Sequence, residues 1–90
     1  MKYIVSWSLP SSTFNAAVAR FVQAGGMPPA AVKMAGRWHG MNNRGFAVVE
    51  TSDPKALYAW VAEWSDVIAI EATPCLEDAD LGEVLRGLKR

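Results

Sequence analysis

Two segments with helical spacing of apolar residues, each set between segments rich in strand-forming residues, constrain this chain most. In both segments apolar residues recur at intervals of three and four: Phe14, Ala17, Val18, Phe21 and Val22, then Leu57, Trp60, Val61 and Trp64. Such spacing gathers the apolar side chains into one stripe along a helix. Each segment therefore predicts a helix that packs on a core through one face.

Residues suited to helix ends flank both segments. Hydroxyl side chains at residues 11–13 can cap the first helix, and Gly25-Gly26 can end it in a left-handed conformation. Asp53 can cap the second helix, with Pro54 at the first helical position, where its missing N–H costs nothing. The second helix is the clearest element of the sequence.

Four further segments, rich in β-branched and aromatic residues, predict strands: residues 3–8, 32–41, 46–51 and 67–73. Pro74 is expected to end the last strand because proline has no backbone N–H for a sheet. Asn42-Asn43 predicts a tight hairpin between the second and third strands, because asparagine tolerates positive φ.

The order strand-helix-strand-strand-helix-strand predicts an α+β, ferredoxin-like (split βαβ) fold. Both helices then cover one face of a four-stranded antiparallel sheet. A short helix follows after Glu77, with acidic residues at its start and basic residues at its end, as the helix dipole favours. We find no repeat and no linker, so residues 1–90 are expected to form one domain.

Composition narrows the classes of partner and compartment. The chain is 51% hydrophobic, so it is expected to fold, and its nine basic side chains balance nine acidic ones. Nucleic acid and anionic membrane surfaces are therefore not expected partners. No apolar run is long enough for a membrane span or a signal peptide. Cys75 is the only cysteine, which favours a reducing cytoplasm.

A two-residue turn at Asn42-Asn43 would decide which side chains share a face of the sheet. It pairs Arg37 with Val48 and His39 with Phe46, which leaves these residues on the open face, away from the helices. Trp38 then packs under the helices. A four-residue turn keeps this assignment, whereas a three-residue turn with a bulge inverts it.

The open face is expected to be half apolar. The same alternation places Ser6, Phe46, Glu50 and Glu71 there with Arg37 and His39. Four strands cover about 300 Å² in projection, near the largest apolar patch that a monomer tolerates. We therefore expect self-association as a homodimer, with a lumen surrounded by Arg37, His39, Glu50 and Glu71.

Several runs in the sequence resemble those of an uncharacterised bacterial family. These runs are Gly36-Arg37-Trp38-His39, Gly45 to Glu50 with Asp53-Pro54, Trp60 with Glu63 to Asp66, and Glu71-Ala72-Thr73-Pro74. Together they resemble the family named domain of unknown function 3303, over most of the chain. The resemblance implies a ferredoxin-like domain similar to the dimeric α/β-barrel superfamily, which includes small monooxygenases, isomerases and haem-degrading enzymes. It brings no reaction or cofactor, because fold does not assign chemistry.

Each candidate site residue has a structural alternative. His39, the only histidine, is the candidate general acid/base or axial haem ligand, or it packs on Phe46. Arg37 and Glu50 form an ion pair, or Arg37 binds a substrate carboxylate. Glu71 is a second carboxylate of the lumen, or is simply solvated. The tryptophans could line an aromatic pocket, but Trp60 and the other helical tryptophan fit a core better.

Two functions follow from these residues. The first is a homodimer that binds a small, partly apolar ligand, with Arg37 and Glu50 at its polar end and Phe46, Glu71 and Ser6 nearby. Such a homodimer would either bind the ligand without reaction or carry out a cofactor-independent acid/base step through His39. The second is a structural or regulatory self-association module without catalysis. The sequence assigns no cofactor and no metal site, because Cys75 has neither a second cysteine nor a nearby histidine.

Overall fold

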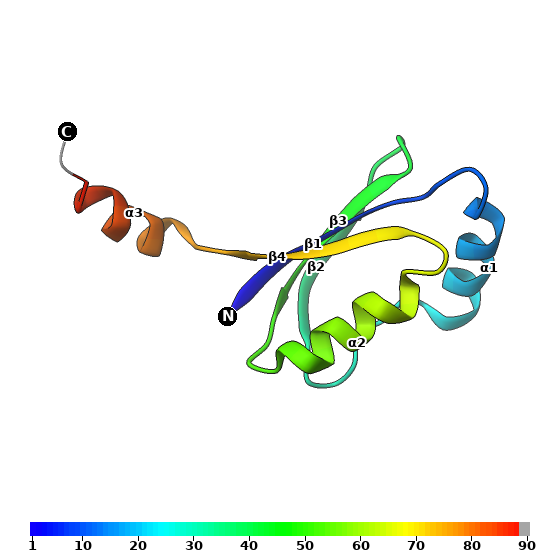
Figure 1. The fold of residues 1–90 in the computed structure, drawn as a ribbon, viewed down its shortest axis with the longest axis horizontal. Helices are drawn as coiled ribbons and strands as arrows, with labels where there is room; N and C mark the ends of the chain where they lie inside the picture. Colours follow the sequence, from blue (N-terminus) through cyan, green and yellow to red (C-terminus); the bar gives the residue numbers. More distant parts are fainter. Residues whose placement is uncertain (89–90) are drawn as a thin grey trace.

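A computed structural model describes residues 1–88, and its elements follow the order expected from the sequence (Figure 1). They are β1 (Lys2–Ser8), α1 (Phe14–Ala24), β2 (Lys33–His39), β3 (Arg44–Glu50), α2 (Pro54–Trp64), β4 (Ala69–Cys75) and α3 (Asp78–Arg86). The strands form one antiparallel sheet in the order β2-β3-β1-β4. The fold is the α+β ferredoxin-like arrangement that the sequence predicts. Within residues 1–88, no helix combines the length and the apolar character that crossing a bilayer requires.

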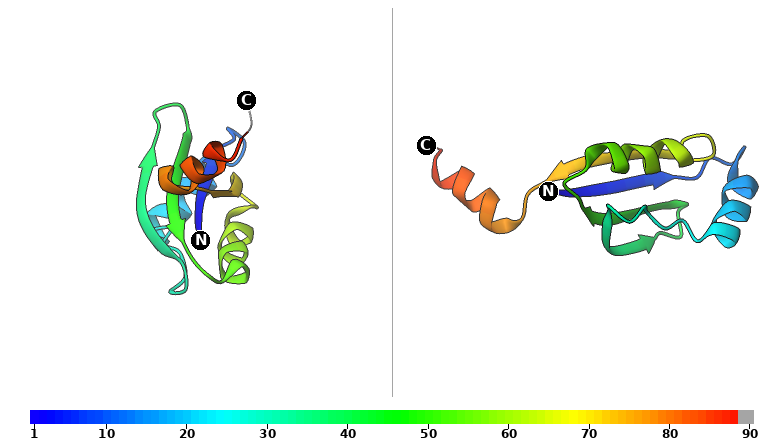
Figure 2. Two further views of the ribbon diagram at one scale, coloured as in Figure 1. Left: turned by 90° about the vertical axis from the view of Figure 1, so that its left-hand side faces the viewer. Right: turned by 90° about the horizontal axis from the view of Figure 1, so that it is seen from below.

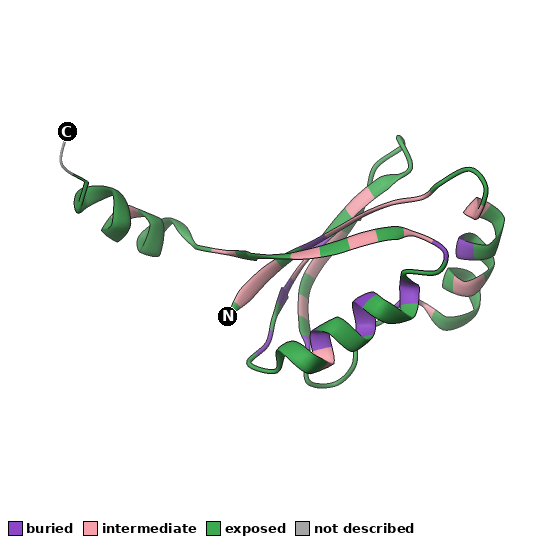
Figure 3. Cartoon of the chain, in the orientation of Figure 1, coloured by how far each residue is buried: buried purple, intermediate pink, exposed green. Residues whose placement is uncertain are grey.

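The core lies between α2 and one face of the sheet (Figures 2 and 3). The apolar stripe of α2 is buried as predicted: Leu57, Trp60, Val61 and Trp64. It meets the sheet face that carries Val5, Ala47 and Val49, all fully buried. The predicted cap is also present, because the Asp53 carboxylate accepts a hydrogen bond from the Ala56 N–H at 3.1 Å. We refer to this side of the sheet as the helix side, and to the other as the open face.

Helix α1 packs less closely than its sequence predicts. It lies near the end of the sheet, beyond α2 (Figure 1), and only Ala17 of its apolar stripe is buried. Val22, which the periodicity placed toward a core, is 79% exposed. The predicted end of the helix is confirmed, because Gly25 has a φ of 78° and its N–H binds the Phe21 carbonyl. Helix α1 therefore buries little of its apolar stripe, although Phe21 reaches the side chains of Arg37 and His39 on β2.

The hairpin between β2 and β3 turns through three residues, Met41 to Asn43, rather than the predicted two. The Gly40 N–H donates to the Arg44 carbonyl at 2.6 Å and closes the turn. Asn43 has a φ of 62°, the left-handed conformation that asparagine tolerates better than most residues. An odd number of turn residues shifts the pairing by one position, which exchanges the two faces of the strand.

The predicted faces of the outer half of β2 are consequently wrong. His39 pairs with Gly45 and Arg37 pairs with Ala47, so both side chains lie on the helix side. Trp38 pairs with Phe46 on the open face, where the two rings stack with centroids 5.3 Å apart. The arrangement of Arg37 and His39 expected on the open face is therefore wrong: Arg37 does not line the hollow there, whereas His39 does.

A bulge at Ala35 restores the predicted faces in the inner half of β2. The pairing shifts between Met34 and Gly36, so that Met34 still lies opposite Val49 on the helix side. One extra residue in a strand reverses the alternation of its side chains. The turn and the bulge each shift the pairing by one residue in the same direction. Two such shifts move the partners by two positions but restore the face, so only the residues between the turn and the bulge are inverted.

Strand β4 also departs from the sequence prediction at both ends. It begins at Ala69 rather than Val67, whose N–H instead binds the Trp64 carbonyl at the end of α2. It continues through Pro74, opposite Tyr3, to Cys75. The predicted stop at Pro74 is wrong because β4 is an edge strand, where a proline need not break the ladder.

We predict that Asn43→Val lowers the free energy of unfolding by about 1–2 kcal/mol relative to Asn43→Gly, because a β-branched residue resists positive φ. Urea denaturation of both variants measures the difference. Glycine is the matched control, since it removes the same side chain and keeps the conformation. Equal stability of the two variants would contradict the three-residue turn.

Candidate functional site

A cavity of about 240 Å³ lies on the helix side, between α1, α2 and the sheet. Its walls are mainly apolar: Trp7, Phe21, Trp60, Trp64, Ile68 and Ile70 are among its lining residues. Arg37 and His39 supply the charged and titratable groups. The volume exceeds the roughly 150 Å³ of an apolar cavity known to admit benzene. The cavity can therefore hold a small organic molecule.

Arg37 is brought to this cavity by the inverted register of β2. Its guanidinium donates to the carbonyl oxygens of Gly26 at 2.7 Å and Gly25 at 3.2 Å, just after α1. It also lies over the Phe21 ring, 5.0 Å from the centroid. Within residues 1–88, no carboxylate forms an ion pair with it. The side chain is thus fixed in place while its charge lacks an acidic partner.

His39 lies at the end of β2 between two aromatic rings. The imidazole centroid is 5.7 Å from that of Trp7 and 5.5 Å from that of Phe21. In the described part of the chain, no hydrogen bond to another residue orients its nitrogens. Aromatic packing holds the ring, and the carboxylate that usually accompanies a catalytic histidine is not beside it.

Trp60 carries the one buried side-chain nitrogen or oxygen of residues 1–88 that lacks a hydrogen-bond partner. The residue is 5% exposed and lines the cavity, and the atom is the indole Nε1. Leaving such a donor unsatisfied costs about 1–3 kcal/mol. The atom is closed to solvent, so neither water nor a molecule in the cavity reaches it in this structure.

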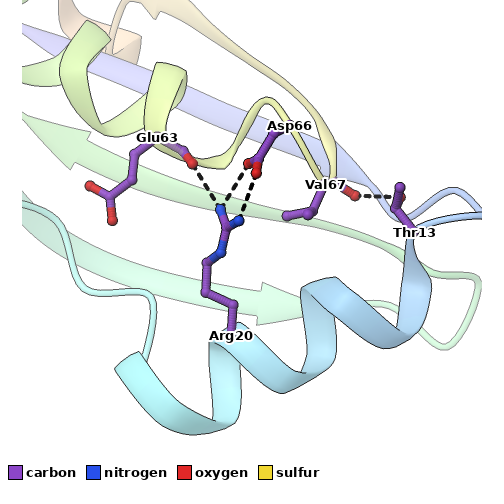
Figure 4. A network of polar contacts seen from close by, with 5 residues as sticks. All are labelled: Thr13, Arg20, Glu63, Asp66 and Val67. Atoms are coloured by element: carbon purple, nitrogen blue, oxygen red, sulfur yellow. Dashed lines mark hydrogen bonds and ion pairs between the residues drawn. The ribbon is translucent and has the colours of Figure 1, made fainter.

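Polar contacts, rather than close packing, attach α1 to the rest of the chain (Figure 4). Arg20 donates two hydrogen bonds to the Asp66 carboxylate, at 2.8 and 2.7 Å, and a third to the Glu63 carbonyl at 2.9 Å. The Thr13 hydroxyl donates to the Val67 carbonyl at 2.6 Å. These contacts join α1 to the connection between α2 and β4, and so hold it at the rim of the cavity.

A second, wider hollow of about 840 Å³ lies over the open face at the hairpin end of the sheet. Ser6, Phe46 and Glu71, which the sequence assigned to a ligand site, line it. Ser6 lies on β1 and pairs with Phe46 of β3 on one side and with Glu71 of β4 on the other. All three therefore share the open face, as the sequence predicts. His39 borders both hollows.

The structure separates the remaining predicted site residues. Glu50 lies on the open face opposite Lys2 and Lys33, and it lines neither hollow. Arg37 lies on the helix side and binds backbone carbonyls. The predicted Arg37–Glu50 ion pair is therefore wrong, because the shifted register sends the two side chains to opposite faces.

Two features of the cavity were missed from the sequence. Trp60 was assigned to the core on its helical spacing, which is correct for burial but says nothing about its N–H. The carbonyls of Gly25-Gly26 were read only as a helix end. The position of Arg37 did leave a signal in the sequence. Gly40 before Met41-Asn42-Asn43 is compatible with a three-residue turn, and that turn brings Arg37 to the helix side.

The fold and the cavity define a ferredoxin-like domain with a hollow between its helices and its sheet. The chain belongs to the family described as domain of unknown function (DUF3303), whose model matches residues 1–89. This confirms the family resemblance inferred from the tryptophans and the Arg37-Trp38-His39 run. No curated protein and no solved structure matches the sequence significantly.

We predict that the attachment of α1 is visible in the titration of Asp66. Hydrogen bonds from Arg20 lower the pKa of this carboxyl below its ordinary value. Because the folded pKa is lowered, the contribution to stability is complete above the unfolded pKa and is lost as the pH falls through the folded pKa. Carboxyl-carbon NMR should give a titration midpoint below that of an ordinary aspartate.

Arg20→Gln is the matched variant for this titration, because it removes the charge and keeps a polar side chain. The Asp66 midpoint should then return toward its ordinary value. An Asp66 midpoint that is the same with and without Arg20 would show that the contact does not hold α1 in solution.

Proposed function

We propose that this chain binds a small, largely apolar carboxylic acid in the helix-side cavity. The observation that carries the proposal is the guanidinium of Arg37, fixed at an apolar cavity without an acidic partner in the described chain. The proposal keeps the ligand class expected from the sequence. It moves the site from the open face to the helix side, and Glu50 no longer takes part.

The geometry of Arg37 supports a carboxylate as the polar end of the ligand. A guanidinium has five N–H donors, and the two glycine carbonyls engage its Nη1 and Nη2 atoms. Donors that remain can bind a carboxylate, which arginine recognises well because of its planar, forked shape. Contact with Phe21 also reduces the freedom of the side chain, so little further ordering is needed on binding.

The walls of the cavity support an apolar body for the ligand. Aromatic and aliphatic side chains, Trp60 among them, would bury the part of the molecule beyond its carboxylate. Among the lining residues His39 is the candidate general acid/base. An acid/base step by His39 stays a prediction, whereas binding requires only Arg37 and the apolar walls.

We predict that Arg37→Met weakens binding of small carboxylates such as benzoate, phenylacetate and hexanoate about tenfold to a hundredfold. A hydrogen bond to a charged group contributes about 1.5–3 kcal/mol, which corresponds to that range. Isothermal titration calorimetry measures the affinities. The corresponding amides, which carry no charge, should bind the unmodified protein more weakly than the acids.

Lys33→Met is the control, because it removes a cation from the same strand but from the open face. It should leave the affinities unchanged. Equal binding of acids and amides, or equal losses in the Arg37 and Lys33 variants, would contradict the proposal.

We also propose that the chain self-associates as a homodimer through its open face, which is the second function expected from the sequence. Ile4, Trp38 and Phe46 lie on this face and are 40%, 54% and 45% exposed. Large apolar side chains gathered on one exposed face are typical of an interaction site. The single cysteine supports a cytoplasmic location for such a dimer.

We predict that Phe46→Asp shifts the protein from dimer to monomer in sedimentation velocity, because a carboxylate would be buried between the two faces. Tyr58→Asp is the matched control. It introduces the same charge in place of an aromatic ring that is 68% exposed on α2, away from the open face. An equal effect of the two changes would argue against pairing of open faces.

A further inference from the structure

Helix α3 projects from the body of the domain as an arm (Figure 1). The Cα radius of gyration is 15.3 Å, whereas a compact chain of this length should have about 12 Å. The longest extent is 50 Å and the other two are 28 and 18 Å. No residue of α3 is buried (Figure 3). Within residues 1–88, the helix packs against no other element of the fold.

The arm nevertheless carries an apolar stripe. Leu81, Val84 and Leu85 lie at helical spacing within α3 and are 44% to 57% exposed. A nine-residue helix is marginal in water without packing of its apolar face. The stripe therefore needs a surface to cover it.

The base of the arm directs this stripe away from its own sheet. Only Leu76 and Glu77 separate β4 from α3, and Glu77 is extended, with a φ of −81° and a ψ of 165°. The Glu77 carboxylate is also ion-paired with Lys2 on β1. A connection of two residues with Glu77 extended does not fold the helix back onto the sheet from which it emerges, and α3 contacts no other element of residues 1–88.

We propose that the arm of one copy packs its apolar stripe on the open face of a second copy. This inference rests on the self-association proposed above and names the segment that completes the interface. It commits to a second copy as the occupant because the arm continues directly from β4, whose Cys75 lies on the open face.

The area of the interface supports this assignment. Four strands of seven residues cover about 440 Å² in projection, whereas a stable dimer buries about 800 Å² on each partner. Pairing of the two sheets alone therefore falls short of what a stable dimer needs. Each copy contributes one arm, so two apolar stripes are added to the interface, one on each side of the two-fold axis.

Charge also matches between the arm and the open face. The first turn of α3 carries Asp78 and Asp80, which have no ion-pair partner in the described chain. Arg44, at the hairpin end of the open face beside Phe46, likewise has no ion pair within residues 1–88. An arm laid on the second copy can bring these opposite charges together at the rim, where they favour one register over others.

Sedimentation velocity over a range of protein concentrations tests the arm through the double variant Leu81→Asp/Leu85→Asp. We expect the dissociation constant of the dimer to rise at least tenfold, with the urea midpoint of the monomer unchanged because α3 is outside the core. Glu83→Gln/Arg86→Gln, on the opposite side of the helix, is the matched control and should leave the dimer intact.

The outcomes separate the two proposals. An unmodified protein that stays monomeric at 100 µM or so would overturn self-association itself, and the arm contact with it. A dimer that the arm variant leaves unchanged would overturn the arm contact alone. The open-face pairing would then stand.

A mixing experiment tests where the arm docks. Phe46→Asp has a damaged open face and an intact arm, and Leu81→Asp/Leu85→Asp has the reverse. Each should be monomeric alone, whereas their equimolar mixture can form one intact contact between an arm and a face. The heterodimer still carries one aspartate between its faces, so we expect it to form in the mixture but more weakly than the unmodified dimer. A mixture that associates no more tightly than either variant alone would contradict docking of the arm on the open face.

Discussion

The turn between β2 and β3 is the constraint on which the site depends. Its three residues fix the register of the hairpin, and Asn43 supplies the left-handed conformation that closes it. One residue fewer would send Arg37 and His39 to the opposite face of the sheet. The cavity would then lose its only cation, and the open face would exchange its tryptophan for two basic side chains.

The cavity has a second requirement, which is that α1 stays away from the sheet. A helix whose apolar stripe packed fully would fill the space with Val18 and Phe21. Here Arg20 and Thr13 attach the helix to the connection after α2 through hydrogen bonds of fixed length. Directional hydrogen bonds fix the distance between α1 and the sheet, whereas apolar packing would make that distance as short as possible. The polar attachment and the hollow beneath α1 are thus one feature of the fold.

Much of the fold was accessible from the sequence because local signals agreed with one another. The cap at Asp53, the glycine end at Gly25 and the stripe of α2 each act over a few residues, and all were correct. The face of β2 was not accessible, because it depends on whether a turn contains two residues or three. Asn42-Asn43 is compatible with both. The bulge at Ala35 adjoins Gly36, and a glycine inside a strand is a signal that suggests a bulge without fixing its position. The unpaired Trp60 N–H depends on tertiary distances alone.

The two irregular positions of the sheet lie on its two edges. Ala35 interrupts the pairing of β2, and Pro74 removes a backbone donor from β4. Bulges and prolines at such positions hinder the addition of a further strand from another molecule. Ribbon-like growth into fibrils is thereby disfavoured at both borders, so copies of this chain have flat surfaces, and not strand edges, through which to meet.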